Sequence, residues 1–147
     1  MMNEKVEVIM MKDLITLRPE DTLTQVSEVF KTKKIHHIPV VEDGKLVGLV
    51  TTYDMWRKNV RHEDYDKIQI KEIMSKRLIK LEPDSKIGTA AELFLDNRFH
   101  ALPVVDGEKL IGLVTTFDIL RYQFKKEYPE AILYKDVLDR IPAPEKD

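Results

Sequence analysis

The chain carries one pattern of about fifty residues twice, and this repeat constrains its fold more than any other feature. When the sequence is shifted by 64 residues, positions 9–57 align with positions 73–121 without a gap, and 22 of the 49 pairs are identical. Pro39 then matches Pro103, and Asp54 matches Asp118. A unit of this size has a marginal core when alone, so the two copies are expected to bury their apolar faces against each other.

Each copy is predicted to begin with a short strand and a helix. In the first copy, an apolar stretch at residues 14–17 ends at Pro19 and predicts the strand. Either Asp21 or Thr22 is expected to cap a helix whose apolar residues follow at helical spacing. Ser85 is the expected cap in the second copy.

The second half of each copy predicts a hairpin and another helix. An Asp-Gly pair separates two apolar runs at residues 43–44 and again at residues 106–107, which is a strong hairpin signal. A second helix is expected to open at residue 51 or 52 and to run to about residue 61, and its twin opens at residue 115 or 116. The expected fold class is mixed α/β (α+β), with two β-α-β-β-α units packed sheet to sheet as a pseudo-twofold pair.

These patterns give four predicted segments. The first repeat spans residues 6–60, a polar connection spans 61–70, the second repeat spans 71–124, and a tail spans 125–147. In the tail, Pro129 and the spacing of the apolar residues predict a short helix that ends before Pro142. This helix is expected either to cover the core or to contact a partner.

Composition excludes several classes of protein. The formal net charge of −2 gives no overall field that would attract nucleic acid or a membrane surface. The absence of cysteine excludes disulfides and thiolate metal sites. No apolar run approaches the roughly 20 residues of a membrane helix, and the N-terminus is too short and too charged for a signal peptide. We therefore expect a soluble, cytoplasmic protein.

Catalytic and metal sites are also not predicted. The four histidines lack the spacing of helical metal ligands, and no carboxylate triad accompanies them. No cysteine is present, and no serine lies in a nucleophile elbow. The sequence therefore does not predict an enzyme.

The motif that most suggests chemistry follows the hairpin of each copy. It reads Gly-Leu-Val-Thr-Thr-x-Asp at residues 48–54 and again at 112–118, where a buried strand is expected to end and a helix to begin. Backbone N–H groups at such a helix start can bind phosphate, and an aspartate can accept hydrogen bonds from ribose hydroxyls. The glycine allows close approach of a ligand or of a neighbouring strand. A Thr-x-x-Asp at this place is also typical of a capping box, and spacing alone favours the cap.

The order of elements, the Leu/Ile-Pro-Val-Val strand, the hairpin and this ending together resemble tandem cystathionine-β-synthase-type (CBS) domains, the pair known as a Bateman module. The resemblance covers about residues 6–124. It implies a disc-like homodimer that binds adenosine-containing ligands in clefts between modules. It also implies an adenine nucleotide as regulatory ligand, no required cofactor and an effector protein that the sequence does not identify.

The resemblance implies roles for individual residues. Asp54 and Asp118 are expected to bind ribose, and Thr51 and Thr115 to contact ribose or phosphate. The residues expected to border the adenine are Ile15, Ile38, Pro39, Ile79, Leu102 and Pro103. Basic residues nearby are expected either to contact phosphate or to form an ordinary solvated rim, and they are Lys34, His36, Arg57, Arg98, His100 and Arg121.

The two copies differ at positions that bear on binding. Before the proline strand the first copy has His37, which would crowd the base, where the second has the small Ala101. In the first strand, Thr16 of the first copy is replaced by Lys80, which removes a hydroxyl but adds a cation. On this basis the cleft of the second copy is expected to be more open, and substitution of Asp118 to have the larger effect.

Two functional hypotheses follow. The first is a stand-alone sensor that binds an adenine nucleotide and passes its occupancy to a partner through a change in the dimer. The alternative is a ligand-free dimerisation scaffold in which the threonines and aspartates only cap helices. In both, the dimer is expected to form through the second helix of each copy, on the apolar residues Met55, Trp56, Val60, Ile119, Leu120 and Phe124.

Overall fold

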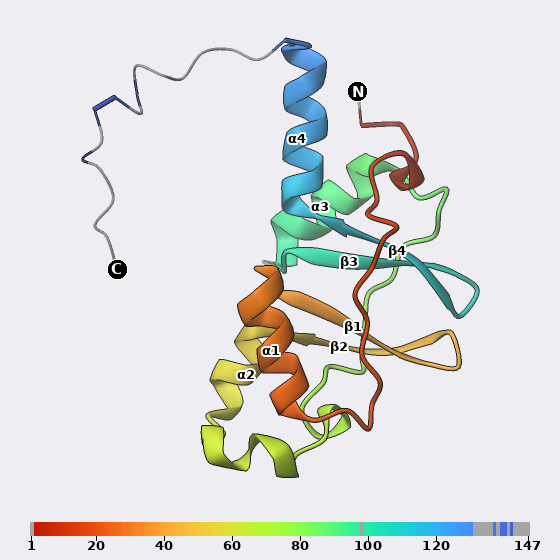
Figure 1. Cartoon of the computed structure of the whole chain (residues 1–147). Coiled ribbons are helices and arrows are strands. Elements are labelled where there is room, and N and C mark those ends of the chain that lie inside the picture. The colour runs from red at the N-terminus through yellow and green to blue at the C-terminus, as the bar shows by residue number, and fades with distance from the viewer. Residues whose placement is uncertain (1, 98, 131–136, 138, 141, 143–147) are drawn as a thin grey trace.

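Two similar halves make up the computed structural model, which describes every residue except 1, 98, 131–136, 138, 141 and 143–147. The first half contains α1 (Leu23–Lys33), β1 (His37–Glu42), β2 (Lys45–Thr51) and α2 (Thr52–Lys58). The second half contains α3 (Ile87–Asn97), β3 (Ala101–Asp106), β4 (Lys109–Thr115) and α4 (Thr116–Glu127). Short 3-10 helices span Val6–Val8, His62–Lys67 and Ile70–Glu72. Figure 1 shows one hairpin in each half, with the helices packed around it.

The two hairpins join in one antiparallel sheet with the strand order β1-β2-β4-β3. The inner strands β2 and β4 pair at Lys45 and Lys109, next to the hairpin turns. There the N–H of Leu46 donates to the carbonyl of Glu108, and the Lys45 ammonium lies 3.1 Å from the Glu108 carboxylate. The mixed α/β fold class and the pseudo-twofold pair are confirmed, and the halves meet edge to edge within a single sheet.

Both hairpin turns use two residues, but the second turn is displaced from its predicted place. In the first turn Asp43 (φ 52°) and Gly44 (φ 78°) are both left-handed, as a type I′ turn requires. In the second, Asp106 still pairs with Lys109, so the turn residues are Gly107 and Glu108. The prediction of an Asp106-Gly107 turn was wrong by one residue, because Gly107 (φ 65°) supplies the left-handed conformation at the first turn position.

The strand predicted at residues 14–17 does not form. Leu17 makes an isolated parallel bridge to Val40, in which its N–H donates to the carbonyl of Pro39 and its carbonyl accepts from Val41. Extending this pairing back to Ile15 would require an N–H at residue 39, and proline has none. Leu81, which bridges Val104, is limited in the same way by Pro103.

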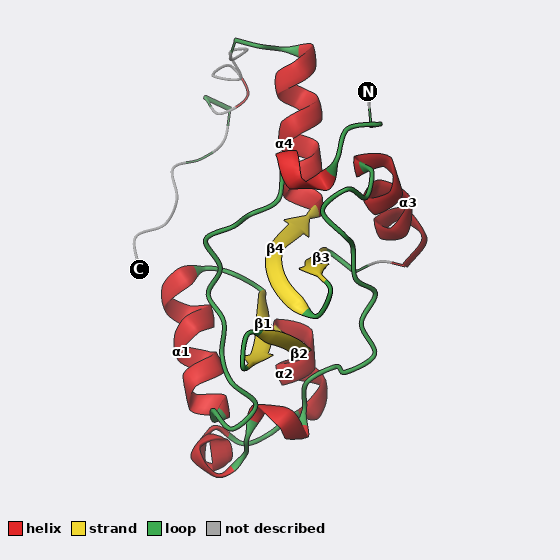
Figure 2. Cartoon of the chain, turned by 90° about the vertical axis from the view of Figure 1, so that its right-hand side faces the viewer, coloured by secondary structure: helices red, strands yellow, loops and turns green. Residues whose placement is uncertain are grey.

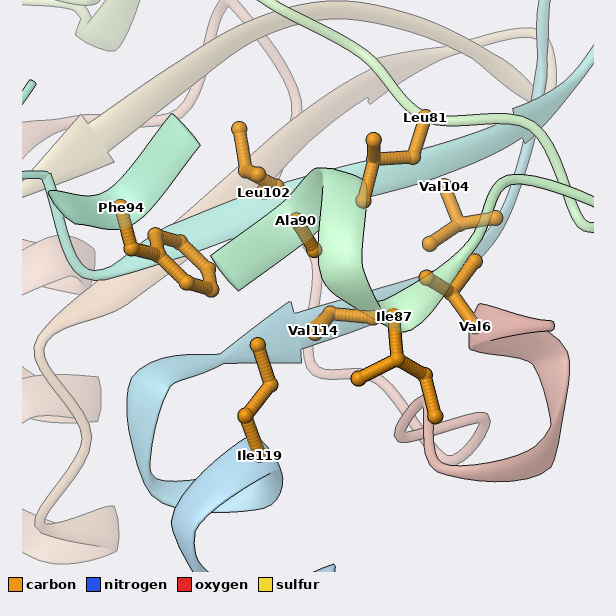
Figure 3. Close-up of a cluster of buried hydrophobic side chains, with 9 residues drawn as sticks. All are labelled: Val6, Leu81, Ile87, Ala90, Phe94, Leu102, Val104, Val114 and Ile119. Carbon is orange, nitrogen blue, oxygen red and sulfur yellow. The ribbon is translucent and has the colours of Figure 1, made fainter. Parts of the chain in front are cut away.

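The segment before each repeat packs into the opposite half. Val6 is fully buried in the core of the second half, and its N–H donates to the carbonyl of Ser85. Figure 3 shows Val6 beside Ile87 and Val104. Ile70 occupies the equivalent place in the core of the first half, where its N–H donates to the carbonyl of Asp21.

Two loop segments consequently run between the halves (Figure 2). Met11 exchanges two backbone hydrogen bonds with Leu113, and Ser75 exchanges two with Leu49. Each core is therefore completed by chain from the other copy. The expected polar connection at residues 61–70 contains a 3-10 helix and ends at the buried Ile70. The predicted boundaries of the two repeats and the tail stay predictions.

The helix ends differ in part from the predictions. Thr22 is the N-cap residue of α1, as one of the two alternatives predicted, and its N–H donates to Oε1 of Gln25 at 2.9 Å. Ser85 is not a cap, because α3 begins at Ile87 and the Ser85 hydroxyl accepts from the N–H of Glu82. The second helix of the first copy ends at Lys58 rather than residue 61, since Asn59 is left-handed (φ 48°). Most of the predicted tail helix lies outside the described residues.

Candidate functional site

The Thr-x-x-Asp motif forms a capping box in both copies. The hydroxyl of Thr51 accepts from the N–H of Asp54 at 3.1 Å, and the Thr51 N–H donates to Oδ2 of Asp54 at 2.9 Å. Thr115 and Asp118 make the same pair of bonds at 3.2 and 2.9 Å. Both aspartates are buried, with exposed fractions of 5% and 4%. These bonds fix each carboxylate and leave its Oδ1 atom for another partner.

That remaining oxygen differs between the copies. Oδ1 of Asp118 accepts from the Arg121 guanidinium at 3.4 Å, and this guanidinium also lies 5.4 Å from the centre of the Phe117 ring. Among the described residues, no donor contacts Oδ1 of Asp54. The equivalent arginine, Arg57, instead lines a pocket together with Asp54. Asp54 is therefore the aspartate that is available to a ligand.

The glycine of the motif serves packing between the halves. A Cβ atom at Gly48 would lie 2.4 Å from Sδ of Met74, and one at Gly112 would lie 2.4 Å from Sδ of Met10. Both methionines lie next to Met11 or Ser75, on the two loop segments that run between the halves. The sequence allowed close approach either of a ligand or of a neighbouring strand. In the structure a neighbouring chain segment approaches the glycine.

Two pockets lie between the repeats, and the larger of them has a volume of about 980 Å³. From the first repeat it is lined by Ile15, His37 and Pro39, and from the second by the start of α4 at Thr115. Three basic residues expected near phosphate also line it, namely Lys34, His36 and His100. Adenine-bordering candidates of the first copy and phosphate-contacting candidates of both copies thus line one pocket together with Thr51 and Thr115.

The smaller pocket has a volume of about 350 Å³ and is assembled the other way round. Thr51, Asp54 and Arg57 come from the first repeat. The second repeat supplies Ile79, Ala101, Leu102 and Pro103. Each pocket therefore contains the proline strand of one copy and the turn of the other, and the larger pocket also contains Thr51, Thr52 and Tyr53 from the turn of the first copy.

This crossing changes the comparison between the two copies. Ala101 lines both pockets, and His37 lines the larger one, so His37 does not close its pocket. Asp118 does not line either pocket. The sequence-based expectation of a more open cleft around Asp118 was wrong, because the larger pocket is the one that contains His37 and Asp118 lines neither pocket.

Some other predicted site residues lie elsewhere. Ile38 is fully buried in the core of the first half, since successive side chains of a strand face opposite sides. Thr16 and Lys80 are exposed and line neither pocket, because they follow Ile15 and Ile79 on the opposite side of an extended segment. Arg121 pairs with Asp118 outside the pockets. Arg98 lies outside the described residues.

Several lining residues were not predicted. Tyr53 and Phe117 occupy the variable place of the motif, and both line the larger pocket. Phe99 lines both pockets, and Arg77 lines the smaller one. For Tyr53 and Phe117, an aromatic residue at the same place in both copies was a signal that the sequence offered. No local pattern indicated Phe99 or Arg77.

Ile15 lines the larger pocket and Ile79 the smaller one, and the backbone of both residues has unpaired hydrogen-bonding groups. Within the described chain, neither the N–H nor the carbonyl of Ile15 or Ile79 has a hydrogen-bond partner. The prolines opposite these residues prevent strand pairing, as described above. A planar ligand with donors and acceptors on its edge would satisfy such groups.

His37 is the titratable pocket residue with the most altered environment. Burial lowers its pKa from the ordinary 6.5 to about 4, and the neighbouring His36 and His100 act in the same direction. His37 is therefore neutral near pH 7. Its ring lies 6.5 Å from that of His36, centre to centre.

Among the described residues, no group of three histidine, cysteine or acidic side chains is arranged to hold a metal ion. No helix of the described chain is both long and apolar enough to cross a membrane.

A family model described as the CBS domain matches residues 6–55 and again residues 70–125. An inosine-5'-monophosphate dehydrogenase of Methanocaldococcus jannaschii is 37% identical over 130 residues, which are 87% of this chain and 25% of that enzyme. The corresponding enzyme of Aquifex aeolicus is 33% identical over 141 residues, covering 94% of this chain and 27% of the enzyme. The chain thus spans about a quarter of the length of these relatives.

Solved structures with the same fold include two complexes. The CBS domain pair of protein MJ0100, in complex with 5'-methylthioadenosine and S-adenosyl-L-methionine, has a TM-score of 0.72 and 28% identity, and the match covers 83% of this chain and 97% of that one. CBSX2 in complex with AMP has a TM-score of 0.75 and 26% identity, covering 84% and 98%.

Proposed function

The chain belongs to the CBS domain family, and on that premise we propose that it is a regulatory module that binds an adenosine-containing nucleotide between its repeats and signals its occupancy to a partner protein. The observation that carries the proposal is that residues of both repeats line each of the two pockets. A ligand in either pocket touches both halves, so it favours the arrangement of the halves that it fits best. Such differential affinity is what couples binding to a partner.

The pocket chemistry supports an adenosine-containing ligand. Apolar residues of both repeats flank the unpaired backbone of Ile15 and Ile79, which suits a purine with polar groups on its edge. The free Oδ1 of Asp54 suits a ribose hydroxyl. Two similar structures were solved with AMP or with S-adenosyl-L-methionine and 5'-methylthioadenosine, which supports the same ligand class.

We expect AMP to bind more tightly than GMP. Guanine exchanges a donor and an acceptor at the edge that meets the backbone of Ile15 or Ile79, so buried polar groups would be left unpaired. Each unpaired group costs about 1–3 kcal/mol, which corresponds to a weakening of about fivefold to 150-fold. Titration calorimetry with both nucleotides measures the difference, and equal affinities would contradict the proposed base pocket.

A thermal-shift screen identifies the ligand within this class. AMP, ADP, ATP, S-adenosylmethionine and NAD should be compared at equal concentration, because a ligand that binds the folded state raises its stability in proportion to RT ln(1 + [L]/Kd). A shift with at least one of them supports the proposal. No shift with any of them, confirmed by calorimetry, supports the scaffold instead.

The capping boxes are the observation that favours the scaffold as second candidate. Thr51, Asp54, Thr115 and Asp118 all have helix-capping partners without any ligand. In that case the module contributes dimerisation alone.

In either case we propose a homodimer formed through α2 and α4. Of the residues expected at this interface, Met55 and Val60 pack against the first core and Ile119 is buried in the second. The other three, Trp56, Leu120 and Phe124, are exposed, and Tyr53 and Phe117 are further exposed aromatic side chains on these helices. Trp56 is 75% exposed and Leu120 67%, so a partner surface would bury considerable apolar area.

The double variant Trp56→Asp/Leu120→Asp is expected to convert the dimer to a monomer, because two charges would have to be desolvated at the interface. Light scattering at micromolar concentration measures the mass, with and without AMP. Leu95→Asp is the matched control, since Leu95 is an exposed leucine (84%) on α3 rather than on α2 or α4. A monomeric wild-type protein under both conditions would overturn the proposed dimer.

A further inference from the structure

The two pockets carry opposite charges at one pair of equivalent positions. The shift of 64 residues that aligns the repeats pairs Asp13 with Arg77. Asp13 lines the larger pocket together with Ile15, and Arg77 lines the smaller pocket together with Ile79. The two segments that bring these isoleucines to the pockets therefore also bring a carboxylate to one pocket and a guanidinium to the other.

The other charged residues add to this contrast. The smaller pocket is lined by Arg57 and Asp54 in addition to Arg77, so it has two cations and one carboxylate. Among the described residues that line the larger pocket, Asp13 is the one carboxylate and Lys34 is the one lysine or arginine. Within the described chain, neither arginine of the smaller pocket forms an ion pair, and neither does Asp13. These charges are therefore available to a ligand.

We propose that positions 13 and 77 sort ligands by charge between the two pockets: Arg77 makes the smaller pocket favour an anionic adenosine derivative, and Asp13 makes the larger pocket accept a cationic one. The proposal rests on the proposed function for the adenosine part, and it concerns the charge of the group attached to that part. One chain can then respond to two ligands of different charge, one in each pocket.

The size of the pockets determines where this effect is larger. A compact pocket of about 350 Å³ is hardly wider than the Debye length, which is about 8–10 Å at ordinary ionic strength. A charge on the ligand therefore interacts with Arg77 wherever it lies in the smaller pocket, and it need not touch the guanidinium. In the larger pocket, of about 980 Å³, the charge can lie farther from Asp13, and Lys34 opposes the carboxylate. We therefore expect the stronger charge preference in the smaller pocket.

Three probes share adenosine and differ in charge. AMP is anionic, adenosine is neutral, and S-adenosylmethionine carries a sulfonium cation. Each is titrated into the whole chain, and its binding is followed by NMR of isoleucine methyl groups. The Ile15 methyl reports on the larger pocket and the Ile79 methyl on the smaller one, because each isoleucine lines one pocket only. Ile15→Val and Ile79→Val assign the two resonances.

Reversing the charge at either position should reverse the preference of its own pocket. Arg77→Asp is expected to lower the ratio of AMP affinity to S-adenosylmethionine affinity about tenfold at the Ile79 methyl, with little change for adenosine. Asp13→Arg should raise the same ratio about threefold at the Ile15 methyl. Both residues are exposed, so these variants are expected to fold. Lys76→Asp is the matched control, because it makes the same change of charge next to Arg77 at an exposed residue that lines neither pocket.

The salt dependence gives a readout that a purely structural role of Arg77 would not change. At about 1 M salt the Debye length falls to about 3 Å, so the difference between the wild type and Arg77→Asp should largely disappear. A difference that persists at high salt, or an equal loss of affinity for all three probes, would mean that Arg77 supports the shape of the pocket, and it would overturn the proposal.

Adenosine separates this proposal from the proposed function. If adenosine and AMP bind but Arg77→Asp leaves the ratio of affinities as it is in the wild type, nucleotide sensing stands and charge sorting fails. An effect of Lys76→Asp as large as that of Arg77→Asp also overturns charge sorting, because position 77 would then not be special. If none of the three probes shifts either methyl resonance, the proposed function fails, and charge sorting fails with it.

Discussion

Replacing Asp54 by asparagine is expected to weaken AMP binding by about tenfold to a hundredfold. Asparagine keeps the shape of the side chain and can still cap α2, but it loses the charged Oδ1 acceptor, which no described residue contacts. Charge-assisted hydrogen bonds contribute about 1.5–3 kcal/mol, which gives this range of affinity. Titration calorimetry of the wild type and the variant at one pH measures the change.

Asp54→Ala separates the ligand contact from the helix cap. It removes the carboxylate that accepts from the Thr51 N–H, so it should also lower the free energy of unfolding by about 0.5–2 kcal/mol. Asp118→Asn is the matched control. Its Oδ1 already accepts from Arg121 and it lines neither pocket, so we expect a smaller effect on affinity. If AMP affinity is unchanged in both asparagine variants while the alanine variant is less stable, the scaffold hypothesis is favoured.

The repeat made the fold predictable from sequence. Two copies with matching Pro39 and Pro103 and matching turn motifs predicted the two hairpins, the helices around them and a pseudo-twofold pair of halves, because periodicity and turn residues act locally. Local signals also produced the error at residues 14–17. The apolar stretch was read correctly, but the missing N–H of its partner Pro39 becomes apparent only when the pairing is known.

Which copy contributes to which pocket could not be predicted. Val6 and Ile70 occupy equivalent positions in the two copies, and an apolar residue before a repeat fits the core of either half equally well. Met11 pairs with the hairpin of the second copy, and Ile15 then lines a pocket with Thr115 of that copy. Ser75 pairs with the hairpin of the first copy, and Ile79 then lines a pocket with Thr51 of that copy. The site residues were mostly identifiable by type, whereas their grouping depends on this tertiary exchange.

Because the two copies exchange core residues, we also expect a large effect on stability from a residue that lines neither pocket. Ile70→Ala should lower the free energy of unfolding by about 2–5 kcal/mol, because Ile70 is fully buried and the remaining core would be left with a cavity. Although Ile70 precedes the second repeat in sequence, it packs with Leu23, Val26 and Ile38 of the first half. Denaturant unfolding measures the loss, and Lys71→Ala, at an exposed neighbouring position, is the control.

Hydrogen exchange shows where the destabilisation acts. After Ile70→Ala, amides of α1 and β1 should lose protection before those of α3 and β3, since local opening follows the core that has lost its contacts. Val6→Ala should give the opposite order, because Val6 packs in the second core. Loss of protection first in α3 after Ile70→Ala would contradict the exchange. If the exchange holds, a fragment limited to residues 6–60 lacks Ile70 and Ile73 from its own core, so neither repeat is expected to fold without the other.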